Sequence, residues 1–404
     1  MQQTKETISL AQDGPVKPNG SVNLLLCSVT LLTIFFLALT ELAVQLARPL
    51  SHLNGTGLTS LNQYFVVSKL PEFLHSNRRA DVLITGSSLF LYPSVRCDDK
   101  LAGRPERHDA DYLRDYVDTY ADCRYLERKL SDNQSKSVSV VNLATAASLF
   151  SDQYLVLKKS IATGKAPQVA ICDISPRTFL DNHQPELDKT PVYLILADFS
   201  SLGELLEARA SFASILHYAV GSVWSFYRDR ADYKEVMVNL FCRLSGHPKT
   251  LFSAVNASPD PKVENAEEKE KNAGPAKNFH QKDLGYYQKA YLPINKDLFA
   301  KEMGFLRNYL ELARASHIKV LAVRMPLTEE NQALLPESWK ADFYKQVETM
   351  SNQYGAVVCN PCDYPSTKFS PSDFEDSAHL NDRGGAKLFD CLAETIRRDH
   401  LLSR

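Results

Sequence analysis

The chain contains 404 residues, of which 44% are hydrophobic and 23% are charged, and its net charge is -2. At about 150 residues per domain, this length allows two or three domains, or one domain with insertions. Ordinary apolar and aromatic contents and a mean hydropathy of -0.26 exclude a collagen-like, wholly disordered or multi-span membrane protein. The near-neutral charge, with no arginine-rich face, argues against nucleic acid as a partner.

The N-terminal part of the chain divides into a polar tail and an apolar run. Residues 1-22 contain Pro15 and Pro18 and are predicted to be a disordered tail. Residues 23-47 are predicted to be a transmembrane signal-anchor, because about 20 apolar residues cross a ~30 Å hydrocarbon core. A buried core helix and a cleaved signal peptide are the alternatives, but the run is long for a signal peptide and lacks a good A-x-A site. Charge alone leaves the orientation open. A short tail before a long domain favours placing the bulk of the chain outside the cytoplasm.

Apolar runs and helical periodicity alternate through the rest of the chain. Strands are predicted at 81-85, 137-143, 168-174, 318-324 and 356-359, and helices at 152-162, 297-316, about 337-354 and about 382-398. Strands that alternate with helices in this way form βαβ units and a parallel sheet. Ligands of such sheets bind beyond the carboxyl ends of the strands.

Two insertions interrupt this pattern. Residues 98-135 are polar and charged. Residues 183-295 form a larger insertion, helical and apolar in its first half and rich in Pro, Glu, Lys and Asn at about 254-283, where a flexible loop is predicted. The helical half is interpreted as a cap beside the active site, with a second membrane-associated element as the alternative. The domain predicted from these boundaries comprises 78-182 and 296-404.

Cysteines occur in two suggestive arrangements. Cys97 and Cys123 flank a polar stretch that a disulfide could close, which fits an oxidising compartment. Cys359 and Cys362 form a C-x-x-C, which is typical of a redox pair, half a metal site or a short-loop disulfide. No second C-x-x-C completes a zinc site, so we predict no metal, and a local disulfide or two free thiols is the plainer interpretation.

Two short stretches carry candidate chemistry. Gly86-Ser87-Ser88 follows the first strand, where a hydroxyl at a strand-to-helix turn is exposed beside backbone N-H groups. Asp376 lies three residues before His379 in the loop that enters the last helix. A carboxylate at that spacing can orient the imidazole, which can then remove a proton from a serine.

These stretches resemble the SGNH/GDSL hydrolase superfamily, in which the serine block reads Gly-Asp-Ser and the last block Asp-x-x-His. The resemblance implies a three-layer α/β/α domain in which Ser88 is the nucleophile, His379 the general base and Asp376 the residue that orients it. The second block of the family has an Asn and then a Gly after the second strand, which implies a place for Asn142 and for the backbone N-H of Ala147 in the oxyanion or substrate site. No metal or organic cofactor is implied.

Two departures from the family pattern stand out. Ser87 replaces the Asp of Gly-Asp-Ser, and the third block, Gly-x-Asn-Asp, is absent. Ser175 or Arg177, after the third strand, are candidates to replace the missing oxyanion Asn. Arg177 could hold an anionic substrate, or it could pair with Asp173 to organise the loop.

Arg324, at the end of the fourth strand, is another candidate to line the site. The N-terminal anchor makes the chain most similar to extracytoplasmic members of the superfamily, such as D-alanyl transfer and polysaccharide O-acetylation proteins.

Three function classes follow. The first is a membrane-anchored serine esterase or O-acyltransferase that acts on an envelope or extracellular polysaccharide. The second is a non-catalytic scaffold of the same fold that binds a glycan or a membrane-bound acyltransferase. The third is a thiol-disulfide protein that uses Cys359 and Cys362.

Overall fold

The computed structural model describes residues 20-47, 69-105, 116-132, 137-184, 190-197, 199-207, 210-224, 241, 244-245, 279-364 and 368-402. Residues 1-19 of the tail predicted at 1-22 lie outside the described residues. Residues 254-278 of the loop predicted at 254-283 also lie outside the described residues.

The predicted anchor lies in helix α1 (Gly20–Ala47). The large apolar side chains described in this helix are exposed, among them Phe35 and Phe36. In the part of the chain that the structure describes, no helix has the length and apolar character that a membrane crossing requires. The transmembrane anchor therefore stays a prediction.

The centre of the molecule is a five-stranded parallel sheet in the order β2-β1-β3-β4-β5. Its strands are β1 (Val82–Thr85), β2 (Val140–Asn142), β3 (Val169–Ile174), β4 (Lys319–Arg324) and β5 (Val357–Cys359). In the register, Leu83 of β1 lies between Val141 of β2 and Ala170 of β3. These are the strands predicted from the apolar runs, and the predicted parallel α/β sheet is confirmed. Both faces of a parallel sheet are covered, which is why its strands are continuous apolar runs.

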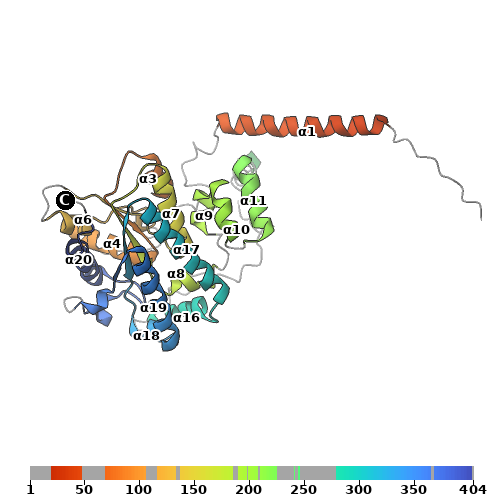
Figure 1. Ribbon diagram of the computed structural model, residues 1–404. Helices are drawn as coiled ribbons and strands as arrows, with labels where there is room; N and C mark the ends of the chain where they lie inside the picture. The colour runs from red at the N-terminus through yellow and green to blue at the C-terminus, as the bar shows by residue number, and fades with distance from the viewer. Residues whose placement is uncertain are drawn as a thin grey trace, which may run out of the picture.

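Helices cover both faces of the sheet (Figure 1). One face carries α4 (Ser88–Leu101), α6 (Arg124–Ser131) and α20 (Asp382–Arg398). The other carries α3 (Lys69–His75), α7 (Phe150–Ala162), α17 (Lys296–Ala315) and α19 (Glu337–Tyr354). Successive strand side chains point to opposite faces, so Ile84 joins the first core and Leu83 the second.

The described helices of the 183-295 insertion are α9 (Pro191–Leu196), α10 (Leu202–Glu207), α11 (Phe212–Val223) and α16 (Phe279–Tyr291). Helix α9 packs on α7, where the Thr190 hydroxyl donates to Asp152 Oδ1 at 2.5 Å. Helix α16 instead packs against α8 (Arg177–Leu180) and α18 (Glu329–Gln332). The insertion thus meets both cores, and α16 reaches the carboxyl edge of the sheet.

Candidate active site

The turn after β1 places Ser88 at the first position of α4. Gly86 makes this turn possible, because a Cβ there would lie 2.9 Å from Asp173 Cβ and 2.9 Å from Phe90 Cδ2. Ser87 is the N-cap of the helix, and its hydroxyl accepts a hydrogen bond from the N-H of Leu89. Ser88 therefore stands at the carboxyl edge of the sheet, on the face covered by α4 and α20.

The Ser87 turn is also held from β3. Asp173 Oδ2 accepts hydrogen bonds from the Ser87 hydroxyl and, at 3.2 Å, from the Ser87 N-H. Burial raises the pKa of Asp173 to about 6. The side chain of Gln153 pairs with the backbone of Asp173 in both directions, which fixes the end of β3. The position that departs from Gly-Asp-Ser is therefore a serine bound to a carboxylate on the neighbouring strand.

The loop before α20 presents His379. Asn381 caps α20 by accepting from the N-H groups of Arg383 and Gly384. The second glycine of the helix, Gly385, allows α20 to pack tightly on α4, because a Cβ there would lie 2.8 Å from Pro93 Cβ. Close contact between these two helices brings the histidine loop to the start of α4.

Ser88, His379 and Asp376 form a continuous hydrogen-bonded chain. His379 Nε2 lies 2.8 Å from Ser88 Oγ, and His379 Nδ1 lies 2.6 Å from Asp376 Oδ2. Burial disfavours the charge of Asp376, but its hydrogen bonds and attraction to His379 outweigh burial and hold its pKa below the usual value. Side-chain exposure is only 14% for His379 and 15% for Asp376, so bulk water reaches the pair poorly. In this arrangement the imidazole can accept the Ser88 proton while the carboxylate stabilises the imidazolium.

Ser377, which lies between Asp376 and His379, forms hydrogen bonds with two other segments of the chain. Its N-H and hydroxyl donate to Asp283 Oδ2 of α16, and its carbonyl accepts from the Thr328 hydroxyl at 3.0 Å. Burial and the nearby charge of Asp376 raise the pKa of Asp283. Sequence reasoning missed Asp283, because it lies 94 residues away from Ser377 in a segment without a motif.

Two residues of α4 complete the support of the loop. The Tyr92 ring packs on His379 with centroids 4.7 Å apart. Arg96 forms a two-pronged ion pair with Glu375, and the Arg96 side chain is only 3% exposed. Both residues were missed from the sequence, although they follow Ser88 by four and eight residues and helical periodicity places them on its face.

Two backbone N-H groups, in the turns after β1 and β2, are candidates to bind an oxyanion. The N-H of Ser88 and that of Ala147 have no acceptor among the described residues. Ala147 has φ of +57°, the left-handed conformation that favours the glycine expected there. Its loop is tied to the turn that carries Ser88, since the Thr145 N-H donates to the Gly86 carbonyl at 2.9 Å.

Asn142 lies in the scaffold under α4, which corrects the expectation that it belongs to the oxyanion or substrate site. It is fully buried, its amide donates to Ser94 Oγ and the Phe90 carbonyl, and its oxygen accepts from the Ala144 N-H. With both ends engaged, Asn142 ties the end of β2 to α4.

The candidates after β3 are placed differently from the prediction. Arg177 donates to Asp181 Oδ2 at 3.0 Å and to the Tyr286 hydroxyl at 2.7 Å. The predicted ion pair with Asp173 is not formed, because Asp181 lies one helical turn ahead and takes its place. With these partners, the Arg177 guanidinium is not free to hold an anionic substrate. Ser175 is fully buried, and its hydroxyl has no partner among the described residues.

Arg324 does not meet the triad. Strand alternation directs it to the face covered by α19, where its guanidinium stacks 3.7 Å from the centroid of the Tyr344 ring. Ser88 lies on the opposite face, so the expectation that Arg324 lines the site is not supported by its placement.

Neither possible disulfide is formed in the structure, and for Cys359 and Cys362 this is the alternative of two free thiols. Cys97, Cys123, Cys359 and Cys362 are all free thiols. Cys359 is buried and Cys362 is exposed. The nearest sulfur partner of Cys359 belongs to α20: its Sγ lies 3.7 Å from that of Cys391.

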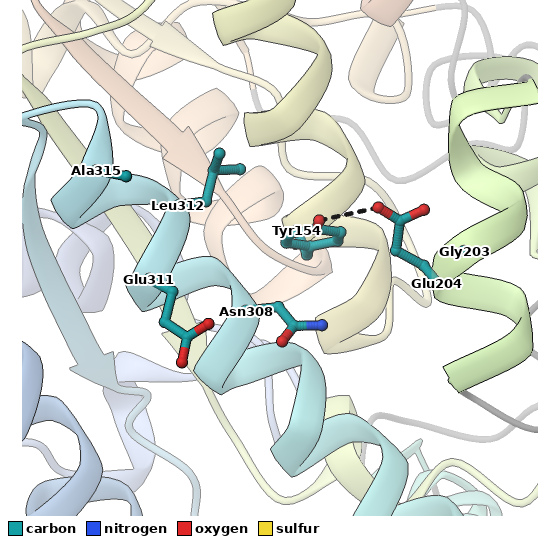
Figure 2. A pocket seen from close by; sticks show the side chains of 7 residues that line it. All are labelled: Tyr154, Gly203, Glu204, Asn308, Glu311, Leu312 and Ala315. Atoms are coloured by element: carbon teal, nitrogen blue, oxygen red, sulfur yellow. Dashed lines mark hydrogen bonds between the residues drawn. The ribbon is translucent and has the colours of Figure 1, made fainter.

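A cavity of about 400 Å³ lies away from the triad, between α7, α10 and α17. Its lining residues are Tyr154, Gly203, Glu204, Asn308, Glu311, Leu312 and Ala315. Figure 2 shows Tyr154 and Glu204 pointing toward each other, with their hydrogen bond of 3.1 Å closing one side. The sheet separates this cavity from α4, so it does not extend the Ser88 site.

Within the described ranges, no three His, Cys, Asp or Glu side chains gather in a metal-binding group. Comparison of the chain with protein-family models gives no match. Comparison with curated proteins also gives no significant match.

Proposed function

We propose that this protein is a serine esterase or O-acyltransferase of the SGNH type. The observation that carries the proposal is the Ser88–His379–Asp376 chain, with distances of 2.8 Å and 2.6 Å between its successive polar atoms. These three residues come from two distant segments of the chain, since Ser88 and His379 are 291 positions apart. Nucleophilic catalysis by a serine uses a base in contact with the hydroxyl, and a third group commonly orients that base.

In the first half-reaction, Ser88 Oγ attacks the carbonyl carbon of an ester while His379 Nε2 takes the hydroxyl proton. Asp376 keeps the other imidazole proton on Nδ1 and stabilises the cation. The tetrahedral oxyanion accepts hydrogen bonds from the N-H groups of Ser88 and Ala147. Collapse expels the alcohol, which takes the proton from His379, and leaves the acyl group on Ser88.

In the second half-reaction, His379 removes a proton from water or from a carbohydrate hydroxyl. That oxygen attacks the acyl-enzyme, and Ser88 leaves with the proton returned by His379. Hydrolysis and transfer share every protein group, and they differ only in which acceptor reaches the acyl carbon. The proposed substrates are acylated glycans of an envelope or extracellular polysaccharide, and the proposed location is outside the cytoplasm on an anchor at 23-47.

A non-catalytic scaffold that binds a glycan or a membrane-bound acyltransferase is the second candidate. One observation favours it: the loop after β3 has no Asn, and its Arg177 is engaged by Asp181. A site with two backbone donors and no side-chain donor stabilises an oxyanion less well.

The test uses the full chain in detergent with p-nitrophenyl acetate and an acetylated oligosaccharide. Ser88→Ala and His379→Ala are each expected to lower turnover by at least ~10³-fold. Ser372→Ala, an exposed serine of the histidine loop, is the matched control and is expected to keep native turnover. Equal turnover in all four proteins would overturn the proposal, as would failure of Ser88 to react with a serine-directed organophosphonate.

A further inference from the structure

We propose that Cys359 and Cys391 form a disulfide that joins the edge strand β5 to α20. Their sulfur atoms lie 3.7 Å apart, the distance of two thiols in contact. Bond formation requires the two sulfur atoms to close from this contact to the bonding distance of about 2.05 Å. The bond would close the chain segment 359-391, which contains Asp376 and His379.

The pairing differs from the one that the C-x-x-C spacing suggests. Cys359, the last residue of β5, has its side chain in the core against α20, and Cys391 has 1% exposure on the facing side of that helix. Cys362 follows in a short 3-10 helix and is exposed. Strand direction and helix packing therefore bring together two cysteines that are 32 positions apart and separate two that are three apart.

The surroundings of the two thiols favour the chemistry. The hydrogen bond from Cys391 outweighs burial and holds the pKa of the Cys359 thiol below its usual value, while the same bond and burial raise that of Cys391. The Thr395 hydroxyl lies 3.6 Å from Cys359 Sγ as a further polar contact. Cys359 is thus the thiol that becomes the attacking thiolate.

The oxidant is a disulfide, either of a small molecule or of an oxidoreductase. The Cys359 thiolate attacks one sulfur of that disulfide and releases the other as a thiolate. Cys391 then loses its proton and attacks the Cys359 sulfur of the mixed disulfide, which releases the second thiolate. Two protein thiols are oxidised and one disulfide is reduced to two thiols, so the balance is closed. Both cysteines are buried once folding is complete. The exchange therefore takes place after β5 and α20 have met and before the core closes over the two sulfurs, and the finished bond is shielded from reductants.

The experiment refolds the reduced full chain in detergent with reduced and oxidised glutathione, blocks remaining thiols with iodoacetamide and digests without reduction. Trypsin cleaves after Lys345, Lys368, Lys387 and Arg397, so a linked pair of peptides 346-368 and 388-397 is expected. The first peptide holds both Cys359 and Cys362. The linked pair should therefore persist in Cys362→Ser and disappear in Cys359→Ser and in Cys391→Ser. Cys172→Ser, at a buried cysteine of β3, is the matched control and should keep it.

Recovery of Cys391 fully alkylated from the refolded native chain would overturn the proposal, and so would a bond from Cys359 to Cys362. A second measurement applies to the folded protein. The oxidised protein is expected to melt roughly 5 °C above the reduced one, because a bond over this segment restricts the unfolded chain. Equal melting temperatures in the two states would contradict the stabilising role. Neither result depends on the proposed esterase activity.

Discussion

Replacing Asp376 by Asn tests the orientation of the base without changing its size. Asp376 Oδ1 accepts from the N-H groups of Ala378, at 2.8 Å, and His379, at 2.7 Å, while Oδ2 faces His379 Nδ1. An Asn keeps one oxygen, and the two backbone donors hold that oxygen in the Oδ1 position. Its NH₂ group is then directed at Nδ1, which must act as an acceptor. The imidazole proton therefore moves to Nε2, where it faces Ser88.

An imidazole protonated on Nε2 cannot take the Ser88 proton. The same substitution in serine proteases lowers kcat by ~10⁴, and at 1.36 kcal/mol per decade this corresponds to about 5.4 kcal/mol of barrier. The fold should be nearly unaffected, because the bonds to Oδ1 remain. The assay is turnover of p-nitrophenyl acetate at saturating substrate, beside thermal melting followed by circular dichroism.

The matched control is Asp342→Asn on α19, an exposed carboxylate that accepts from Gln346, and its turnover should stay native. A folded Asp376→Asn protein with kcat within tenfold of native would refute the orienting role. A variant that melts far below the native protein would instead show that the carboxylate mainly holds the loop together.

Two further predictions concern stability. Gly86→Ala should lower the free energy of unfolding by about 1–3 kcal/mol through overpacking, since the new methyl group would overlap Asp173 and Phe90; a loss below about 0.5 kcal/mol in urea unfolding would contradict the close approach. Glu302 is fully buried, and burial raises its pKa from 4.5 to about 8, so between these values the native state holds a proton that the unfolded state releases. Stability should therefore fall as pH rises through this window. Glu302→Gln should make the urea midpoints at pH 5 and pH 8 differ less than in the native protein, and an unchanged difference would count against this.

Much of the site follows from local sequence. Each strand is a short apolar run, and a parallel sheet places the ends of β1 and the loop before α20 at the same edge. The triad was predicted because its motifs are local: a turn after a strand for Ser88, and a three-residue spacing for Asp376 and His379. Ala147 was placed by the resemblance, which implies a glycine at this position, and its positive φ fits that glycine.

Other residues were placed differently because at least one partner of each lies in a distant segment. Asn142 looked like a site residue, but the packing of α4 on the sheet offers it Ser94 and the Phe90 carbonyl. Arg177 has Asp181 one turn ahead, and α16 adds Tyr286 from 109 positions away. Spacing along the chain contains no information about the contacts with Ser94 and Tyr286, whereas the i,i+4 spacing of Arg177 and Asp181 can be read from it.

The sequence by itself therefore determined the parallel α/β architecture and the candidate nucleophile, base and acid, because hydrophobic period and motif spacing are properties of neighbouring residues. Only the tertiary structure decided that Asp283 holds the loop that carries His379, that Arg324 faces the other side of the sheet and that Cys359 meets Cys391. The physical reason is that these contacts depend on which helix faces cover the sheet. Helix packing is set by the shape of the whole core, in which residues 32 or 94 positions apart become neighbours.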